Sequence, residues 1–112
     1  MFQILDFKPI AAGEKVVIDE QLKSQYKGIT GLTIWTPKNE QMRNIDIELD
    51  IDNKEVFPAG FPAEIFSSNQ FRDTDASMFK QEFPANSKIE GSIKNNNDTS
   101  VTGLSIIFFV KL

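Results

Sequence analysis

The sequence predicts an all-β protein, an eight-stranded antiparallel β-sandwich of jelly-roll or related Greek-key topology. Two observations carry this prediction. Short runs of apolar and β-branched residues recur along the chain, and turn-forming residues separate them at intervals of roughly ten residues. No segment has the periodicity of a long amphipathic helix. The chain of 112 residues has neither an internal repeat nor a linker, so we expect one β-sandwich domain over residues 1–112.

The first three strands are expected in the N-terminal third of the chain. Residues 2–7 form an apolar-rich run that a proline closes, and residues 14–19 carry the β-branched sequence VVI. Residues 29–36, with the sequence ITGLTIWT, are rich in β-branched and aromatic side chains and also end at a proline. The polar residues 19–27 between the second and third runs fit a single helical turn or a loop.

Five more strands are expected in the rest of the chain. Residues 45–52 alternate strictly, and the turn-forming sequence DNK that follows lets residues 55–57 return as the second arm of a hairpin. Prolines and a glycine in FPAGFPAEIF are expected to break any longer ladder there. Residues 78–83 and 88–94 are further strands joined by PANS, and a polar turn precedes the last strand, residues 101–112.

The alternating sequence IDIELDID is the part of the chain that most resembles a chemical site. In a strand, its four carboxylates share one face and its four aliphatic side chains share the other. The carboxylates are Asp46, Glu48, Asp50 and Asp52. Calcium needs six to eight oxygen ligands around one point, and a straight strand splays its side chains apart. We therefore interpret these residues as the solvated face of a strand and predict no metal site.

A second acidic segment, RDTDAS at residues 72–77, begins like a calcium-binding loop. Counted from Asp73, the EF-hand pattern requires glycine at its sixth position and glutamate at its twelfth, where this chain has Met78 and Pro84. We interpret this segment as a turn closed by side-chain hydrogen bonds.

Composition restricts the chemistry further. The chain has no histidine and no cysteine, so it cannot build a Ser-His-Asp triad, a Cys-His pair, or an imidazole or thiolate metal site. We expect no enzyme activity and no cofactor. The net charge of −4 and the lack of a basic stripe argue against direct binding of nucleic acid. No run approaches 18 apolar residues, and MFQILDFKPI lacks the features of a signal peptide, so neither a membrane span nor secretion is expected.

Two aromatic residues, Trp35 and Tyr26, raise the possibility of a ligand platform, because exposed rings on β-sandwich modules stack on sugars. The alternative is that Trp35 packs in the core. Ile29, Thr33 and Trp35 share one parity in ITGLTIWT, and Leu32 and Ile34 share the other, so both faces of this strand carry apolar side chains. Core packing is the favoured interpretation.

The C-terminal strand contains apolar side chains on both faces, since Ile106, Phe108 and Val110 form one set and Ile107 and Phe109 form the other. One set is expected to fill the core. The other is covered either by a loop, for which FPAGFPAEIF is a candidate, or by another subunit. We favour the subunit, and we predict an interface along residues 106–110 in a homo-oligomer or a larger assembly.

In outline, the chain resembles the small single-jelly-roll proteins of bacterial virions, such as vertex (penton), spike-base and head-decoration proteins. The resemblance lies in eight strands starting at Met1, the connector PANSKIEGSIKNNND and the closing strand GLSIIFFVKL. It implies a structural role in a symmetric capsid assembly, a virion location after synthesis in the host cytoplasm, and no active site. No motif matches residue by residue, so no functional residue carries over. The alternative function is a carbohydrate-binding type of ligand-binding module, and the alternative location is the cytoplasm.

Overall fold

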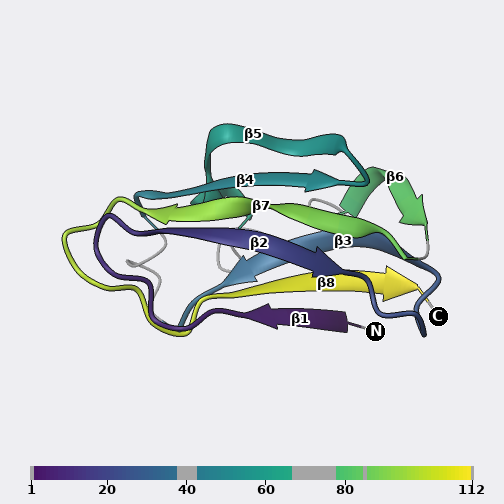
Figure 1. The fold of residues 1–112 in the computed structure, drawn as a ribbon, viewed down its shortest axis with the longest axis horizontal. Helices are drawn as coiled ribbons and strands as arrows, with labels where there is room; N and C mark the ends of the chain where they lie inside the picture. The colour runs from purple at the N-terminus through teal and green to yellow at the C-terminus, as the bar shows by residue number, and fades with distance from the viewer. Residues whose placement is uncertain (1, 38–42, 67–77, 85, 112) are drawn as a thin grey trace.

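The computed structural model describes residues 2–37, 43–66, 78–84 and 86–111, and within these ranges the chain forms strands and one short 3-10 helix (Figure 1). No helix among the described residues is long and apolar enough to cross a membrane. In chain order the elements are β1 (Phe2–Asp6), β2 (Lys15–Gln21), β3 (Gly28–Trp35), β4 (Ile45–Ile51), β5 (Lys54–Pro62), η2 (Ala63–Phe66), β6 (Met78–Pro84), β7 (Lys88–Asn95) and β8 (Ser105–Lys111).

The topology is that of a long antiparallel hairpin rolled up on itself. β1 pairs with β8, β2 with β7, β3 with β6 and β4 with β5, and every pair is antiparallel. Two further pairs, β3 with β8 and β4 with β7, complete the sheets. The first sheet has the order β1-β8-β3-β6, and the second has the order β2-β7-β4-β5. This nesting of pairs is a jelly roll, which confirms the predicted fold class.

The core lies between the two sheets and follows from the period-two burial of their strands. Along β4, every second residue from Ile45 to Ile51 is buried, while the acidic residues between them are partly exposed. β8 shows the same alternation, with Ile106, Phe108 and Val110 in the core. The remaining large side chains that are fully buried are Ile10, Ile29, Leu32, Ile34, Ile89, Ile93 and Leu104.

β5 is longer than the sequence indicated. The expected arm was residues 55–57, but the strand runs from Lys54 past Pro58 to Pro62. The predicted break in the ladder is present, because residues 58–60 have no partner on β4 between the pairs Leu49–Phe57 and Ile47–Phe61. The strand nevertheless continues beyond this break, since β5 is an edge strand of the second sheet, where missing N–H groups are tolerated. The first of two register shifts in its pairing with β4 spans Gly60, which has a positive φ angle, and the second lies at Val56.

Two other boundaries differ from expectation. The polar segment after residue 19 begins as strand, because β2 continues to Gln21 and the N–H of Leu22 still donates to the carbonyl of Ser87 at 2.9 Å. The last strand starts at Ser105, not at residue 101. Val101 forms only an isolated bridge with Ile10.

The hairpin between β4 and β5 turns within the predicted sequence DNK, and its loop consists of Asp52 and Asn53, because Lys54 already pairs with Ile51. Both residues have positive φ angles, 52° and 62°, as a type I′ turn requires. The carboxylate of Asp52 accepts hydrogen bonds from the hydroxyl of Ser87 and the N–H of Lys88, each at 2.9 Å. Asp52 therefore stabilises a turn and does not extend the exposed acidic face of β4.

Asn95, at the end of β7, joins three segments at one end of the sandwich. Its side chain is fully buried, and its Nδ2 donates to the carbonyls of Ile10 at 3.0 Å and Thr99 at 2.9 Å. Its Oδ1 accepts the backbone N–H of Asn97 at 2.9 Å, and its own N–H donates to the carbonyl of Glu14 at 3.0 Å. This one residue thus fixes the β1–β2 and β7–β8 connections relative to each other.

We predict that Asn95→Ala lowers the free energy of unfolding by about 1–3 kcal/mol, because it leaves buried carbonyls without their donor. The matched control is Asn96→Ala, whose side chain donates to Asp46 at an exposed site. This control should change stability by less than about 0.5 kcal/mol. Urea denaturation followed by circular dichroism measures both values. Equal effects of the two substitutions would contradict the structural role assigned to Asn95.

Candidate functional site

The acidic face of β4 is confirmed as the outer, solvated face of the second sheet. Asp46, Glu48 and Asp50 are partly exposed, whereas the aliphatic residues between them are buried. Burial of one face therefore explains the alternation without a metal or catalytic role. The second acidic segment, residues 72–77, lies outside the described residues.

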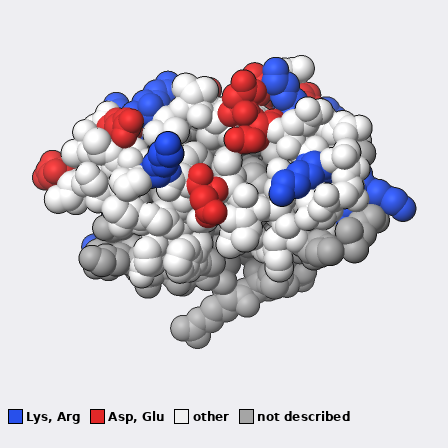
Figure 2. Space-filling model, turned by 60° about the horizontal axis from the view of Figure 1, so that its bottom comes forward, with Lys and Arg blue, Asp and Glu red and all other residues white. Residues whose placement is uncertain are grey.

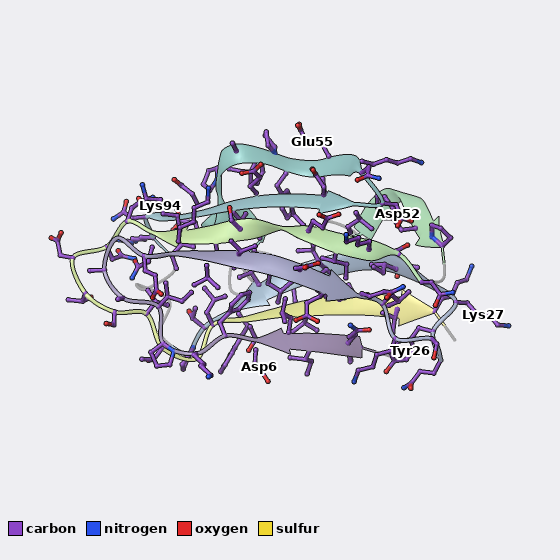
Figure 3. All side chains as sticks on the ribbon, in the orientation of Figure 1. Asp6, Tyr26, Lys27, Asp52, Glu55 and Lys94 are labelled. Carbon is purple, nitrogen blue, oxygen red and sulfur yellow. The ribbon has the colours of Figure 1, made fainter. Side chains whose placement is uncertain are left out.

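Pairing between strands creates an acidic feature that β4 alone does not reveal. Asp19 of β2 lies opposite Glu90 of β7, Glu90 lies opposite Asp50 of β4, and Asp50 lies opposite Glu55 of β5. We call these four residues the carboxylate row. Figure 3 shows Glu55 on β5, the strand that forms the edge of this sheet. In Figure 2, acidic side chains gather in one part of the visible surface.

The carboxylate row places like charges directly opposite each other, which destabilises a sheet. Two unit charges about 5 Å apart in water repel by about 0.8 kcal/mol, less in salt. One lysine partly offsets this repulsion, since Lys88 Nζ lies 3.6 Å from Glu90 Oε1. Among the described residues, no group of three acidic side chains converges closely enough to hold a metal ion.

The other end of the outer face of the second sheet carries both basic and acidic side chains. A shallow concavity of about 400 Å³ lies there, lined by Lys15 and Lys94 together with Asp46 and Glu48. Lys94 lies directly opposite Asp46 across the β4–β7 pair. Charges of both signs alternate here, so the strongly acidic character of the face is confined to the carboxylate row.

The outer face of the first sheet is mainly apolar along β1 and β8. Register places Phe2 opposite Phe109 and Ile4 opposite Ile107, so these four side chains share a face. Phe2 and Ile4 are 55% and 57% exposed, and the rings of Phe2 and Phe109 lie 5.4 Å apart. Trp35 of β3 is 40% exposed and lies diagonally beside Ile107, since it pairs with the neighbouring Ser105. We call these five residues the apolar strip.

The apolar strip lies on the side of β8 away from the core. Ile107 and Phe109 are only partly buried, whereas the alternate set of β8 fills the core. The segment FPAGFPAEIF is not the cover for this strip: Phe57 and Ala63 belong to the core, and η2 contacts β3 and β4. Along the described parts of β1, β3 and β8, the charged residues of this face are Asp6 and Lys111, which lie at its two ends.

The two candidate ligand-platform residues do not form one platform. Trp35 lies at the last position of β3, while Tyr26 precedes the first position of the same strand. Tyr26 is only 7% exposed, and its hydroxyl donates to the carbonyl of Phe2 at 3.3 Å. Figure 3 shows Tyr26 at the end of the molecule near the start of β1. The favoured interpretation of Trp35 as a core residue was wrong.

Phe2 and Ile4 were not predicted as surface residues, although the sequence contains a signal for their exposure. The run FQIL has large apolar side chains at both parities, which is the same pattern that marked the C-terminal strand. A strand with apolar side chains on both faces either has other residues packed on each face or leaves one apolar face exposed to solvent. β1 is an edge strand of the first sheet and leaves one face exposed.

We predict that thermal melts recorded with millimolar calcium and with a chelator coincide, because the carboxylate row spreads its charges over four strands. Differential scanning fluorimetry measures both curves. The control is Asp50→Asn, which should have the same melting temperature in both conditions. A rise of several degrees in calcium that Asp50→Asn abolishes would show a metal site that this geometry does not support.

The chain was also compared with known proteins. No family model, no curated protein and no solved structure matches it. The resemblance to the jelly-roll proteins of virions therefore stays a prediction.

Proposed function

We propose that this protein is a non-enzymatic structural subunit of a symmetric assembly and that the apolar strip is the surface that contacts neighbouring copies. The observation that carries the proposal is the exposure of Phe2, Ile4 and Trp35 beside two partly exposed residues of β8. Contiguous exposed apolar side chains are characteristic of protein contact surfaces, since each one left in water forgoes the free energy of burial.

A second copy of the chain is the partner that best fits this strip. The middle of the strip is uncharged, with Asp6 and Lys111 at its ends. Two copies related by a two-fold axis could bury this surface without burying a charge, and an isologous interface requires such self-complementarity. The carboxylate rows of two copies would repel each other, so association through the opposite sheet is disfavoured.

The assembly that we propose is a virion of a bacterial virus, in which the protein serves as a vertex, spike-base or decoration subunit. The support is the jelly-roll topology, which viral capsid proteins share with lectins and cupins, together with an outer face suited to neighbouring subunits. Topology alone does not determine function, so the test must examine the assembly itself. The proposed partners are other protein subunits, with no direct contact to nucleic acid and no cofactor.

A ligand-binding module of the carbohydrate-binding type is the second candidate, and the exposure of Trp35 favours it. Because Tyr26 is buried, the ring of Trp35 beside Ile107 is the part of the predicted platform that remains available to a sugar. A glycan array discriminates between the candidates: specific binding that Trp35→Ala abolishes would support the module. The assembly proposal requires that no glycan binds specifically.

We predict that Ile4→Lys gives a folded protein that associates at least about tenfold more weakly, because the substitution places a charge in an apolar contact. Circular dichroism checks the fold, and sedimentation velocity with light scattering measures association. The matched control is Val17→Lys. Val17 is 73% exposed on the other sheet, so this variant should associate like the wild type.

Two results would contradict the assembly proposal. One is a wild-type protein that stays monomeric at all concentrations and does not copurify with particles. The other is equal weakening of association by both lysine variants, which would indicate a general effect of charge and not a contact through the apolar strip.

A further inference from the structure

We propose that the groove between β1 and β2 binds an extended peptide segment of a partner protein, with alternating apolar and basic side chains, as an added strand along the β2 edge. The groove encloses about 350 Å³ and lies between the edges of the two sheets. It is separate from the apolar strip, and the proposal does not rest on the assembly function.

The edge of β2 that faces away from β7 presents free backbone groups. Leu22 N–H donates to the carbonyl of Ser87, and Asn95 N–H donates to the carbonyl of Glu14. These bonds show that the backbone N–H and C=O groups of the even-numbered residues in this segment are directed toward β7. In an antiparallel ladder, the backbone groups of the alternate residues are directed to the opposite edge of the strand. The N–H and C=O groups of Lys15, Val17 and Asp19 are therefore directed outward, and no described strand pairs with them on that side.

One end of the groove is closed by side chains. Gln3 Nε2 donates to the carbonyl of Gln21 at 3.3 Å, and Gln3 Oε1 accepts the N–H of Lys23 at 2.9 Å. These contacts connect the start of β1 to the end of β2. The carbonyl of Gln21 is thus already engaged at the closed end, while the edge from Lys15 to Asp19 lies beside the open part of the groove.

The walls of the groove supply apolar contacts for alternate side chains of an added strand. Leu5 and Phe7 line it from the first sheet, and Val16 and Ile18 line it from the second. Leu5, Phe7 and Val16 are only partly buried although they pack against the core. A strand placed on the β2 edge would direct every second side chain toward these residues, which is the period that strand addition requires.

The rim of the groove selects for basic residues. Asp6, Glu14, Asp19 and Glu20 line it, against a single lysine, Lys8. Asp6 accepts a hydrogen bond from Ser105 and Glu14 accepts one from Ala11 N–H, whereas Asp19 and Glu20 are exposed. Asp19 is also the first member of the carboxylate row. A lysine or arginine opposite Asp19 on the added strand would extend the row with a counter-charge.

The charges of the groove favour a basic peptide over a second copy of the chain. The chain has a net charge of −4, and the groove rim is itself acidic, so self-association here brings like charges together. A basic strand gains attraction at the same positions and is steered toward the groove. The occupant that fits best is therefore a segment from a different protein.

A designed peptide tests this proposal directly. The probe is a heptapeptide with blocked ends, lysine at odd positions and valine at even positions. Calorimetry should show saturable binding, and NMR should show amide hydrogen exchange slowed about tenfold or more at Lys15, Val17 and Asp19. Two control peptides, one with glutamate in place of lysine and one with proline at the central valine, should not bind. A probe that does not bind, or that protects only amides of β1, overturns the proposal.

Two protein variants test the contacts. Asp19→Lys should weaken binding of the probe about fivefold, and its matched control Glu55→Lys, at the far end of the carboxylate row, should have no more than about a twofold effect. Val17→Pro should weaken binding about tenfold, since it removes an outward N–H and leaves the ladder to β7 intact. Melting curves check that each variant is folded. Equal effects of Asp19→Lys and Glu55→Lys would indicate nonspecific attraction and overturn the proposal, as would self-association of the protein alone that Val17→Pro abolishes.

Discussion

The structure depends on β8, a strand that is apolar on both faces and central in its sheet. It lies between β1 and β3, so its backbone is paired on both edges and its two side-chain sets face opposite directions. Ile106, Phe108 and Val110 close the core, which leaves Ile107 and Phe109 on the outside. The roll of the chain then brings β1 beside them, and its own outward residues extend this surface into the apolar strip.

The two sheets therefore present different surfaces. Along β1, β8 and the end of β3, the first sheet exposes aliphatic and aromatic side chains with charges at the two ends, and the second sheet exposes the carboxylate row. Where the edges of the sheets approach at β1 and β2, the surface combines both characters, with apolar walls and an acidic rim. This division gives the molecule a face suited to copies of itself and a groove suited to a partner of opposite charge.

The fold could be predicted largely because local patterns agree with the final pairing. The alternation of IDIELDID identified the buried face of β4, and the sequence DNK at residues 52–54 identified its turn. The length of β5 could not be predicted in this way, because prolines are tolerated only if a strand lies at an edge, and edge position is a property of the whole sheet. The role of Asn95 was hidden for a similar reason, since its partners come from distant loops.

The surfaces were only partly predictable. The two-faced pattern of β8 was visible in the sequence, but pairing with β1 and β3 determines which residues accompany Ile107 and Phe109. The carboxylate row joins residues from four strands and has no local signature. Trp35 is the only tryptophan of the chain, and it lies on the apolar strip, so its fluorescence reports directly on whether the strip is covered. As protein concentration rises, we predict that Trp35 emission shifts to shorter wavelength and that quenching by acrylamide decreases, in step with the association seen by light scattering. Association without any change in Trp35 emission or quenching would contradict it.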